Sequence, residues 1–387
     1  MPVALFRIVY GVLIIATLVL LHPDWLNWYG THAWVSLETA RTLEPGVRLN
    51  LFAVIPQRDS WIAALFWVFL GSAVLLTLGF LTRFNSLLVY ICLTSIHQRN
   101  LYINHGGDTF LRVAGFFLIF APAGAALSVD RLIRVWRGKE DAKIPARAPW
   151  AQRMIQVELA LMYFATFCWK VQGVPWVKGT ALYYVYHLDE LQRFYVPPWM
   201  LRPTILRIGT WVGLALEFSL GVLVWVKELR YYLLGMGVVF HLWLEYSLNV
   251  PMFEWDVLSA YVLFVEPADM ARVWKWIRGR VAARLGEEVT VCYDGNSPRL
   301  RAQANLLRAL DVFRRLKFAN SRDSGVTIPA QMDRGRLTVL TRAGARQGFE
   351  GVMELAGVVP LLWPLAGVGV VRRLSGLGGK SPGIKRD

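Results

Sequence analysis

The chain is poor in charge and in cysteine, and both shortages narrow what it can be. Only 18% of its 387 residues are charged, and it contains 3 cysteines. Cys92, Cys168 and Cys292 lie far apart and form no C-x-x-C pair, so the sequence predicts no disulfide framework. A His-x-x-x-His pair is also lacking, which argues against a metal-binding motif. We therefore expect no bound metal.

Apolar residues are abundant instead. They make up 55% of the chain, which includes 17 Trp, and the mean hydropathy is +0.40. Apolar runs long enough to cross a bilayer recur along the first two thirds of the sequence. We expect about eight transmembrane helices, at residues 3–21, 61–81, 84–101, 111–129, 154–171, 205–226, 231–250 and 255–266. The fold class predicted for residues 1–267 is thus an all-α polytopic membrane domain.

The distribution of Lys and Arg predicts the orientation of this domain. Residues 131–153 hold seven of them, and residues 268–387 hold 21 of the 42 in the chain. The positive-inside rule places both segments in the cytoplasm, so we expect both termini there, in a multi-pass protein of the cell inner (plasma) membrane. The net charge of +15 then describes a surface that attracts anionic lipid, not nucleic acid. The first apolar run lacks a small-x-small cleavage site and is expected to remain as a helix.

One polar stretch, SIHQRNLYINHGGDTFLR at residues 95–112, lies on the outer side of the membrane in this topology. It contains the candidate binding residues His97, Arg99, Asn104 and Asp108 and the candidate catalytic residue His105. All six histidines of the chain fall in the predicted outer half or in mid-membrane, and histidine is the side chain that titrates near neutral pH. We interpret the stretch as the rim of an intramembrane site. An ordinary hydrated loop is the alternative.

Ionisable residues in the predicted spans form a second group of candidates, because burying them in lipid is costly. Glu217, His241 and Glu245 lie inside spans, and Lys170 lies at the outer end of the fifth. His241 and Glu245 are four residues apart, so they share a helix face. A structural hydrogen bond is the alternative for these two residues, and an interfacial anchor is the alternative for Lys170.

Four segments carry a resemblance to a known family. They are RIVYG, QRNLYINHGGDTFLRVAGFFLIFAPAGAALSVDRL, LMYFATFCWKVQGVPWVKGTAL and FHLWLEYSLNVPMFEWDVLS, and they extend over about residues 1–267. In this order they resemble the HTTM (horizontally transferred transmembrane) domain family, whose relatives include the vitamin K-dependent gamma-carboxylases. In that family a lysine is the proposed base that deprotonates a reduced quinone. The matching residue here is Lys170, followed by Trp176, although the carboxylases carry Lys-Lys where this chain has Trp169-Lys170.

The resemblance implies further site residues and a cofactor. His241 matches the family's histidine in the seventh span, and Asn104, His105 and Asp108 fall in its polar cluster before the fourth. It implies a reduced quinone of the menaquinone or vitamin K type, which would reach the site from the bilayer. An apolar setting disfavours a charged lysine, so a neutral amine would be available as a base. His105 and the backbone amides of the adjacent Gly-Gly pair would stabilise developing negative charge, and Arg99 would neutralise an acidic substrate.

The sequence also departs from the carboxylases. They carry a large lumenal domain that binds the substrate propeptide, whereas residues 287–387 predict a small α/β domain, so glutamate carboxylation does not transfer. Two functions remain. The first is a quinol-linked enzyme that modifies or matures an exported peptide by lyase or oxidoreductase chemistry, with Lys170 as base. The second is a non-catalytic membrane chaperone or scaffold for peptide maturation or export, whose tail docks a cytoplasmic partner.

The tail begins after a basic linker expected at residues 268–286. We expect strands in EEVTVCYDGNSP, RLKFANS and RLTVLTRAG, a helix in SPRLRAQANLLRALDVFRRLKF with Ser297 as N-cap, and a second helix from near Gln347. The apolar run VMELAGVVPLLWPLAGVGVV contains Glu354 and two prolines, so we expect it to form core and not a membrane span.

The stretch YDGNSPRL resembles the start of the DCC family of thioredoxin-like proteins, Tyr-Asp-Gly-x-Cys-x-x-Cys. Ser297 and Leu300 stand here at the two cysteine positions. Thiol–disulfide exchange needs an attacking thiolate and a resolving thiol, and these residues supply neither. The resemblance therefore implies a thioredoxin-like domain with degenerate redox positions, kept for docking or stability. Cys292, one residue before the motif, is expected to be packed in the core.

Overall fold

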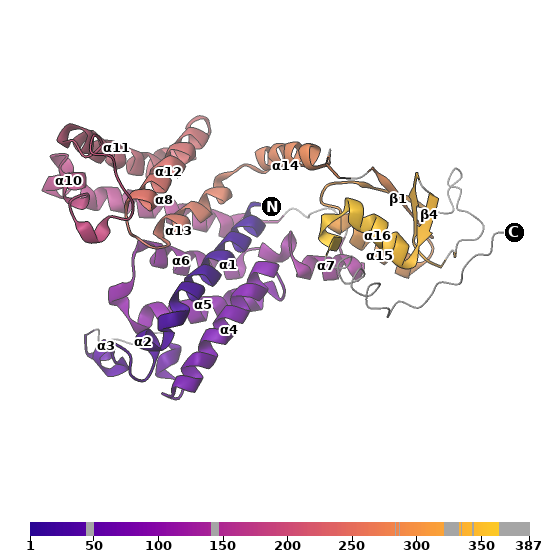
Figure 1. The fold of residues 1–387 in the computed structure, drawn as a ribbon, viewed down its shortest axis with the longest axis horizontal. Helices are drawn as coiled ribbons and strands as arrows, with labels where there is room; N and C mark the ends of the chain where they lie inside the picture. Colours follow the sequence, from indigo (N-terminus) through magenta and orange to yellow (C-terminus); the bar gives the residue numbers. More distant parts are fainter. Residues whose placement is uncertain are drawn as a thin grey trace. The chain divides into compact units, whose positions relative to one another are not determined.

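The fold is described from a computed structural model of the chain. The structure describes residues 1–43, 50–140, 147–282, 284–285, 287–320, 333, 335–342 and 344–363. The chain is divided into two compact units (Figure 1). The helical unit consists of Met1–Val129 and Ala146–Pro267, and the sheet unit consists of Asp130–Pro145 and Ala268–Asp387. The candidate site lies in the helical unit.

The helical unit contains helices at each of the eight predicted positions, together with short connecting helices. The long helices are α1 (Pro2–Leu21), α4 (Asp59–Leu78), α5 (Thr82–Arg99), α6 (Gly106–Phe120), α8 (Trp150–Lys170), α11 (Pro203–Val222) and α12 (Lys227–Ser247). The short helices are α2 (Trp25–Tyr29), α3 (Leu37–Leu43), α9 (Val174–Val177), α10 (Ala181–Val185) and α13 (Phe253–Ser259), and a 3-10 helix at Ala260–Phe264 follows α13. The apolar runs therefore predicted where the helices lie.

Three helical segments among the described residues are long and apolar enough to cross a membrane: Pro2–Tyr29, Asp59–Leu78 and Pro203–Trp225. The expected number of eight spans is not confirmed. Helix α6 has 15 residues and is about 22 Å long at 1.5 Å per residue, shorter than a hydrocarbon core of about 30 Å. Helix α8 carries Arg153 and Glu158, α5 is rich in polar residues, and the last predicted span is broken between α13 and the 3-10 helix.

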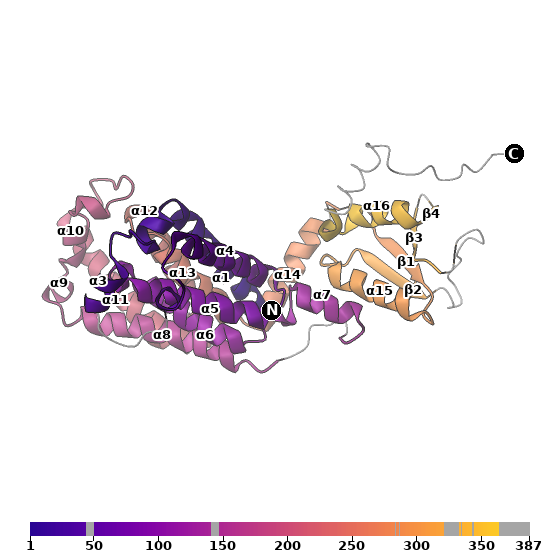
Figure 2. The same ribbon diagram turned by 90° about the horizontal axis from the view of Figure 1, so that it is seen from below.

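The helices pack around one apolar core in a continuous series. Helix α1 contacts α4, α4 contacts α5, α5 contacts α6, α6 contacts α8, and α8 contacts α11, which in turn contacts α12. Figures 1 and 2 both show α1 beside α4 and α5. The short α13 contacts α1, α6 and α12. This central place lets α13 present side chains to several helices.

The sequence RIVYG ties α1 into this series. The Arg7 side chain is fully buried and donates hydrogen bonds to the carbonyl oxygens of Thr77, Ala123 and Leu127 at 3.3, 2.8 and 2.5 Å. These carbonyls lie at the end of α4 and after α6. The Tyr10 hydroxyl donates to the Leu111 carbonyl at 3.2 Å. A charged side chain is stable in such a position because carbonyl oxygens replace water around it.

The sheet unit contains a four-stranded mixed sheet with the strand order β2-β1-β3-β4. The strands are β1 (Val289–Tyr293), β2 (Leu316–Asn320), β3 (Thr338–Thr341) and β4 (Gly344–Gln347), and the helices of this unit are α7 (Val129–Trp136), α14 (Pro267–Ala282), α15 (Pro298–Leu310) and α16 (Gly348–Val358). Strand β1 pairs parallel with β2 and antiparallel with β3. Strand β3 lies within the predicted third strand, and β4, which pairs antiparallel with it, was not predicted.

Most tail elements appear where the sequence predicted them. The Ser297 hydroxyl accepts a hydrogen bond from the Leu300 amide at 3.4 Å and caps α15, as expected, but the helix ends at Leu310. Helix α16 begins directly after Gln347, and its Leu355 packs in the core of this unit. The last part of the predicted core run, residues 364–371, lies outside the described residues. The segment expected as a linker, 268–286, is largely occupied by α14.

Candidate functional site

Lys170, the last residue of α8, faces α11. Its ammonium Nζ lies 2.5 Å from Oε1 of Glu217, and the two side chains are 25% and 7% exposed. Nζ also lies 4.4 Å from the ring centre of Trp176, which the helical turn α9 carries back over it. The structure therefore joins three of the predicted residues, and the lysine forms a charge-assisted hydrogen bond with the carboxylate. Glu217 Oε2 is buried and has no hydrogen-bond partner among the described residues.

His241 lies at the centre of a second, fully buried polar cluster. Its Nδ1 contacts a carboxylate oxygen of Glu254 on α13, and its Nε2 lies 2.5 Å from the hydroxyl of Tyr163 on α8. That hydroxyl lies 2.7 Å from the hydroxyl of Tyr261 in the 3-10 helix. The Glu254 carboxylate accepts a hydrogen bond from Nδ1–H, which leaves the Nε2 lone pair to accept a hydrogen bond from the Tyr163 hydroxyl. The four residues form a hydrogen-bonded chain that can hold or move a proton.

The two clusters share helix α8. Tyr163 precedes Lys170 by seven residues, about two helical turns, so both side chains leave α8 on the same side. Their partners come from α11, α12 and α13. Helix α8 is therefore the element that sets the spacing between the Lys170–Glu217 pair and the His241 chain.

Glu245 is not part of this arrangement. Although it follows His241 by one helical turn, its carboxylate pairs with Arg193 in the loop after α10. Arg99 is also turned away from the candidate site: its side chain is buried and donates to the carbonyl oxygens of Val35 and Ser36 at 2.7 and 3.5 Å. In the structure both residues hold loops against the helices.

The polar stretch before α6 forms a third cluster. His105 caps this helix, because its Nδ1 accepts from the Gly107 amide at 3.0 Å while Asp108 Oδ2 accepts from the His105 amide at 2.9 Å. His97 Nε2 lies 3.4 Å from the other Asp108 oxygen, and the Asn104 side chain donates to the His97 carbonyl at 2.8 Å. The predicted polar residues do converge here. The Gly107 amide, which was expected to stabilise developing negative charge, instead donates its hydrogen bond to His105.

Four residues in these clusters were not predicted as site residues: Tyr163, Glu254, Asp256 and Tyr261. Asp256 lies near His105 and Asp108, and one ligand atom from each of the three lies within 4.8 Å of the other two. Among the described residues this is the group whose side chains could hold a metal ion. Glu254 and Asp256 were visible in the sequence PMFEWDV as two carboxylates at the start of a predicted span.

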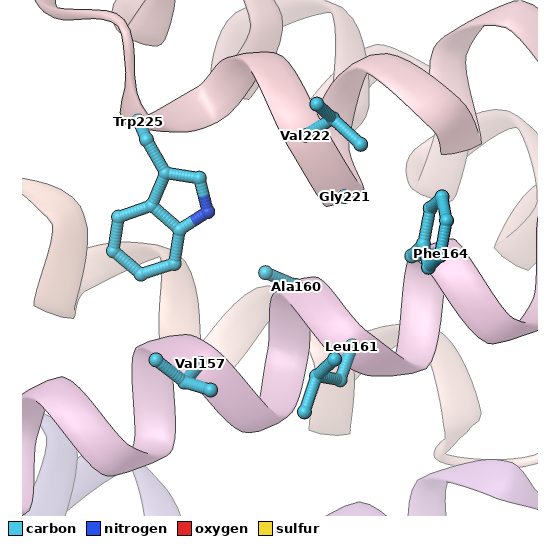
Figure 3. A pocket seen from close by; sticks show the side chains of 7 residues that line it. All are labelled: Val157, Ala160, Leu161, Phe164, Gly221, Val222 and Trp225. Carbon is cyan, nitrogen blue, oxygen red and sulfur yellow. The ribbon is translucent and has the colours of Figure 1, made fainter.

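An apolar groove lies between α8 and α11 (Figure 3). It has a volume of about 370 Å³ and is lined by Val157, Ala160, Leu161, Phe164, Gly221, Val222 and Trp225. A Cβ atom at Gly221 would lie 2.9 Å from the backbone nitrogen and from Cβ of Phe164, so glycine permits the two helices to approach this closely. The lining offers a hydrocarbon chain an apolar surface, and Phe164 lies next in sequence to Tyr163 of the His241 chain.

The family description "HTTM domain" matches residues 2–268. No curated protein and no solved structure matches the chain. The matched region begins in α1 and ends one residue after Pro267, the last residue of the helical unit.

Proposed function

Because the chain belongs to the HTTM domain family, we propose that it is a quinol-linked membrane enzyme that modifies or matures an exported peptide. Membership of this family indicates that the chain is a membrane protein of a carboxylase-related family. The observation that carries the rest of the proposal is the Lys170–Glu217 pair, an amine and a carboxyl group held 2.5 Å apart in a largely buried setting.

The pair gives Lys170 a route to the neutral form that a base requires. Transfer of one proton from Nζ to Glu217 Oε1 converts the ion pair into a neutral amine and a neutral carboxylic acid. Low polarity lowers the cost of this transfer because the transfer removes two buried charges. The amine then holds a lone pair that can accept a proton, and Glu217 keeps the first proton until it is released. Lys170 is thus the proposed base and Glu217 its proton acceptor.

A reduced quinone of the menaquinone or vitamin K type, when bound, would supply an acidic hydroxyl and reducing electrons. The apolar groove between Val157 and Trp225 suits the hydrocarbon tail of such a molecule, and a lipophilic molecule can enter it from the bilayer. Trp176, which covers Nζ of Lys170, would limit water at the amine. His241, oriented by Glu254, would hold or pass a proton through Tyr163.

The tail supports a second candidate, a non-catalytic scaffold for peptide maturation or export. We propose that the sheet unit is a redox-inactive relative of the DCC domains. Ser297 is used as a helix cap and Leu300 is buried in place of the two motif cysteines. Cys292 is buried in β1. A domain without redox chemistry would be retained to dock a partner, which on the charge distribution would be cytoplasmic.

The deciding experiment replaces Lys170 in the native host. We would complement a deletion strain with wild type, Lys170→Ala or Lys170→Met at matched membrane abundance and record the masses of exported peptides. Lys178→Ala is the matched control, since Lys178 is exposed eight residues away. Loss of a general base costs about 100- to 10,000-fold in rate, so a peptide mass shift should disappear only in the Lys170 variants. Unchanged masses with full complementation would reject the base and favour the scaffold.

A further inference from the structure

The cluster at the start of α6 combines a histidine with two carboxylates from separate elements. His105 and Asp108 come from the end of a loop and the first turn of α6, and Asp256 comes from α13. His105 Nδ1 lies 3.7 Å from Asp108 Oδ2, and one ligand atom from each of the three residues lies within 4.8 Å of the other two. Two atoms that each bind a metal at about 2.0–2.2 Å can lie up to about 4.4 Å apart, so the 3.7 Å separation fits a shared ion.

Asp256 provides an independent indication that something is bound. Its side chain is 1% exposed, and its Oδ1 has no hydrogen-bond partner among the residues that the structure describes. A buried carboxylate without a partner is costly, and a second carboxylate, that of Asp108, lies beside it. Asp256 therefore needs a positive charge beside it or a proton shared with Asp108. A Cβ atom at Gly107 would lie 2.8 Å from Asp256 Oδ2, so glycine at this position admits the carboxylate to the cluster.

We propose that His105, Asp108 and Asp256 bind a divalent transition-metal ion such as Mn²⁺, Fe²⁺ or Zn²⁺. One imidazole and two carboxylates form a mixed nitrogen and oxygen ligand set that suits these ions. The ion would replace the Gly107 amide as the partner of His105 Nδ1 and would compensate both carboxylates. His97, whose Nε2 lies 3.4 Å from Asp108, acts as a positioning residue that orients this ligand.

The site is open on one side. The side chains of His105 and Asp108 are 29% and 19% exposed, whereas Asp256 closes the cluster from within. Three protein ligands leave coordination positions for water or for an oxygen ligand. No sequence motif indicated this site, because the third ligand, Asp256, is remote from the other two in the chain. The proposal is independent of the quinol proposal, since it concerns different residues and its test measures bound metal.

The test uses the full-length protein in lipid nanodiscs after removal of metal with a chelator. Mn²⁺ is titrated and followed by the loss of the free-ion electron paramagnetic resonance signal, and Zn²⁺ content is measured by mass spectrometry. We expect about one ion per chain, loss of detectable binding in Asp256→Asn and in His105→Ala, and about 10- to 100-fold weaker binding in His97→Gln. His32→Ala, which changes an exposed histidine, and Lys170→Ala should bind as wild type does.

Two further measurements keep the result clear if a variant folds poorly. Metal added to chelator-treated wild type should raise its melting temperature, which requires no substitution. Infrared difference spectra report a protonated carboxyl group directly. Wild type that binds neither ion, together with a protonated carboxyl band that Asp256→Asn removes, would overturn the proposal and assign a shared proton instead. Binding that survives both Asp256→Asn and His105→Ala would overturn it as well.

Discussion

Glu254 and Asp256 lie two residues apart on α13 and serve different clusters. Glu254 contacts Nδ1 of His241, whereas Asp256 lies beside Asp108 and Gly107 at the start of α6. Two residues that are two positions apart on an α-helix point about 200° away from each other around its axis. One short helix can therefore supply a carboxylate to a cluster on each of its two sides. Helix α13 is therefore the element through which a displacement at one cluster would reach the other.

The first prediction concerns the hydroxyl of Tyr163, which joins His241 to Tyr261. Tyr163→Phe leaves Nε2 of His241 and the Tyr261 hydroxyl without this partner in a buried position. We expect a loss of about 1–3 kcal/mol in the free energy of unfolding. Thermal unfolding in detergent would measure it. Tyr232→Phe is the control because Tyr232 is 75% exposed, and equal melting temperatures for the two variants would contradict the role of the hydroxyl.

The second prediction concerns the coupling of Lys170 and Glu217. Lys170→Met alone leaves the Glu217 carboxylate buried without its cation, whereas the double variant Lys170→Met/Glu217→Gln removes both charges. Because an unpaired buried charge costs more than a neutral pair, the single variant should be the less stable of the two, by about 1–3 kcal/mol. A double-mutant cycle on thermal unfolding measures the coupling. Additive effects would show that the pair does not contribute to stability.

The third prediction tests the apolar groove. Leu161→Trp fills space between α8 and α11, so quinone bound there should be lost while the fold is retained. We expect an affinity about tenfold weaker, which corresponds to about 1.4 kcal/mol. The quinone content of protein purified from native membranes would be measured by chromatography. Val239→Trp places the same side chain at an exposed position of α12 and should leave the content unchanged. Equal losses of quinone in both variants would show that the quinone does not bind in this groove.

The fourth prediction concerns thiol reactivity in the tail. Burial raises the pKa of the Cys292 thiol, and the thiolate is the reactive form. At pH 8 Cys292 should therefore react slowly with a maleimide until the protein is unfolded. Peptide mass mapping would follow the labelling. Arg342→Cys introduces a comparison thiol at an 87% exposed side chain of the same unit. Labelling of Cys292 at the rate of the introduced cysteine would contradict a redox-inactive, packed role.

The sequence was most informative about the helices and least informative about their side-chain partners. Apolar runs placed the seven long helices of the helical unit because their composition directly determines which segments leave water, whereas α14 lies in a segment that was expected to be a linker. Lys170, Glu217 and His241 were recognised one by one because a charge is conspicuous in an apolar run. Their partners depend on which helices pack together. Local spacing placed Glu245 and His241 on one helix face, but Glu245 pairs with Arg193 in a distant loop, whereas His241 contacts Glu254.

The buried Arg7 has a consequence for how the protein is made. Two of its three carbonyl acceptors, those of Ala123 and Leu127, are synthesised 116 and 120 residues after it. A ribosome adds roughly 5–20 residues per second, so the guanidinium waits for several seconds before these acceptors exist. During that interval a lone charge in hydrocarbon would be costly. We therefore expect helix α1 to stay near water or within the insertion machinery until the end of α6 has been synthesised.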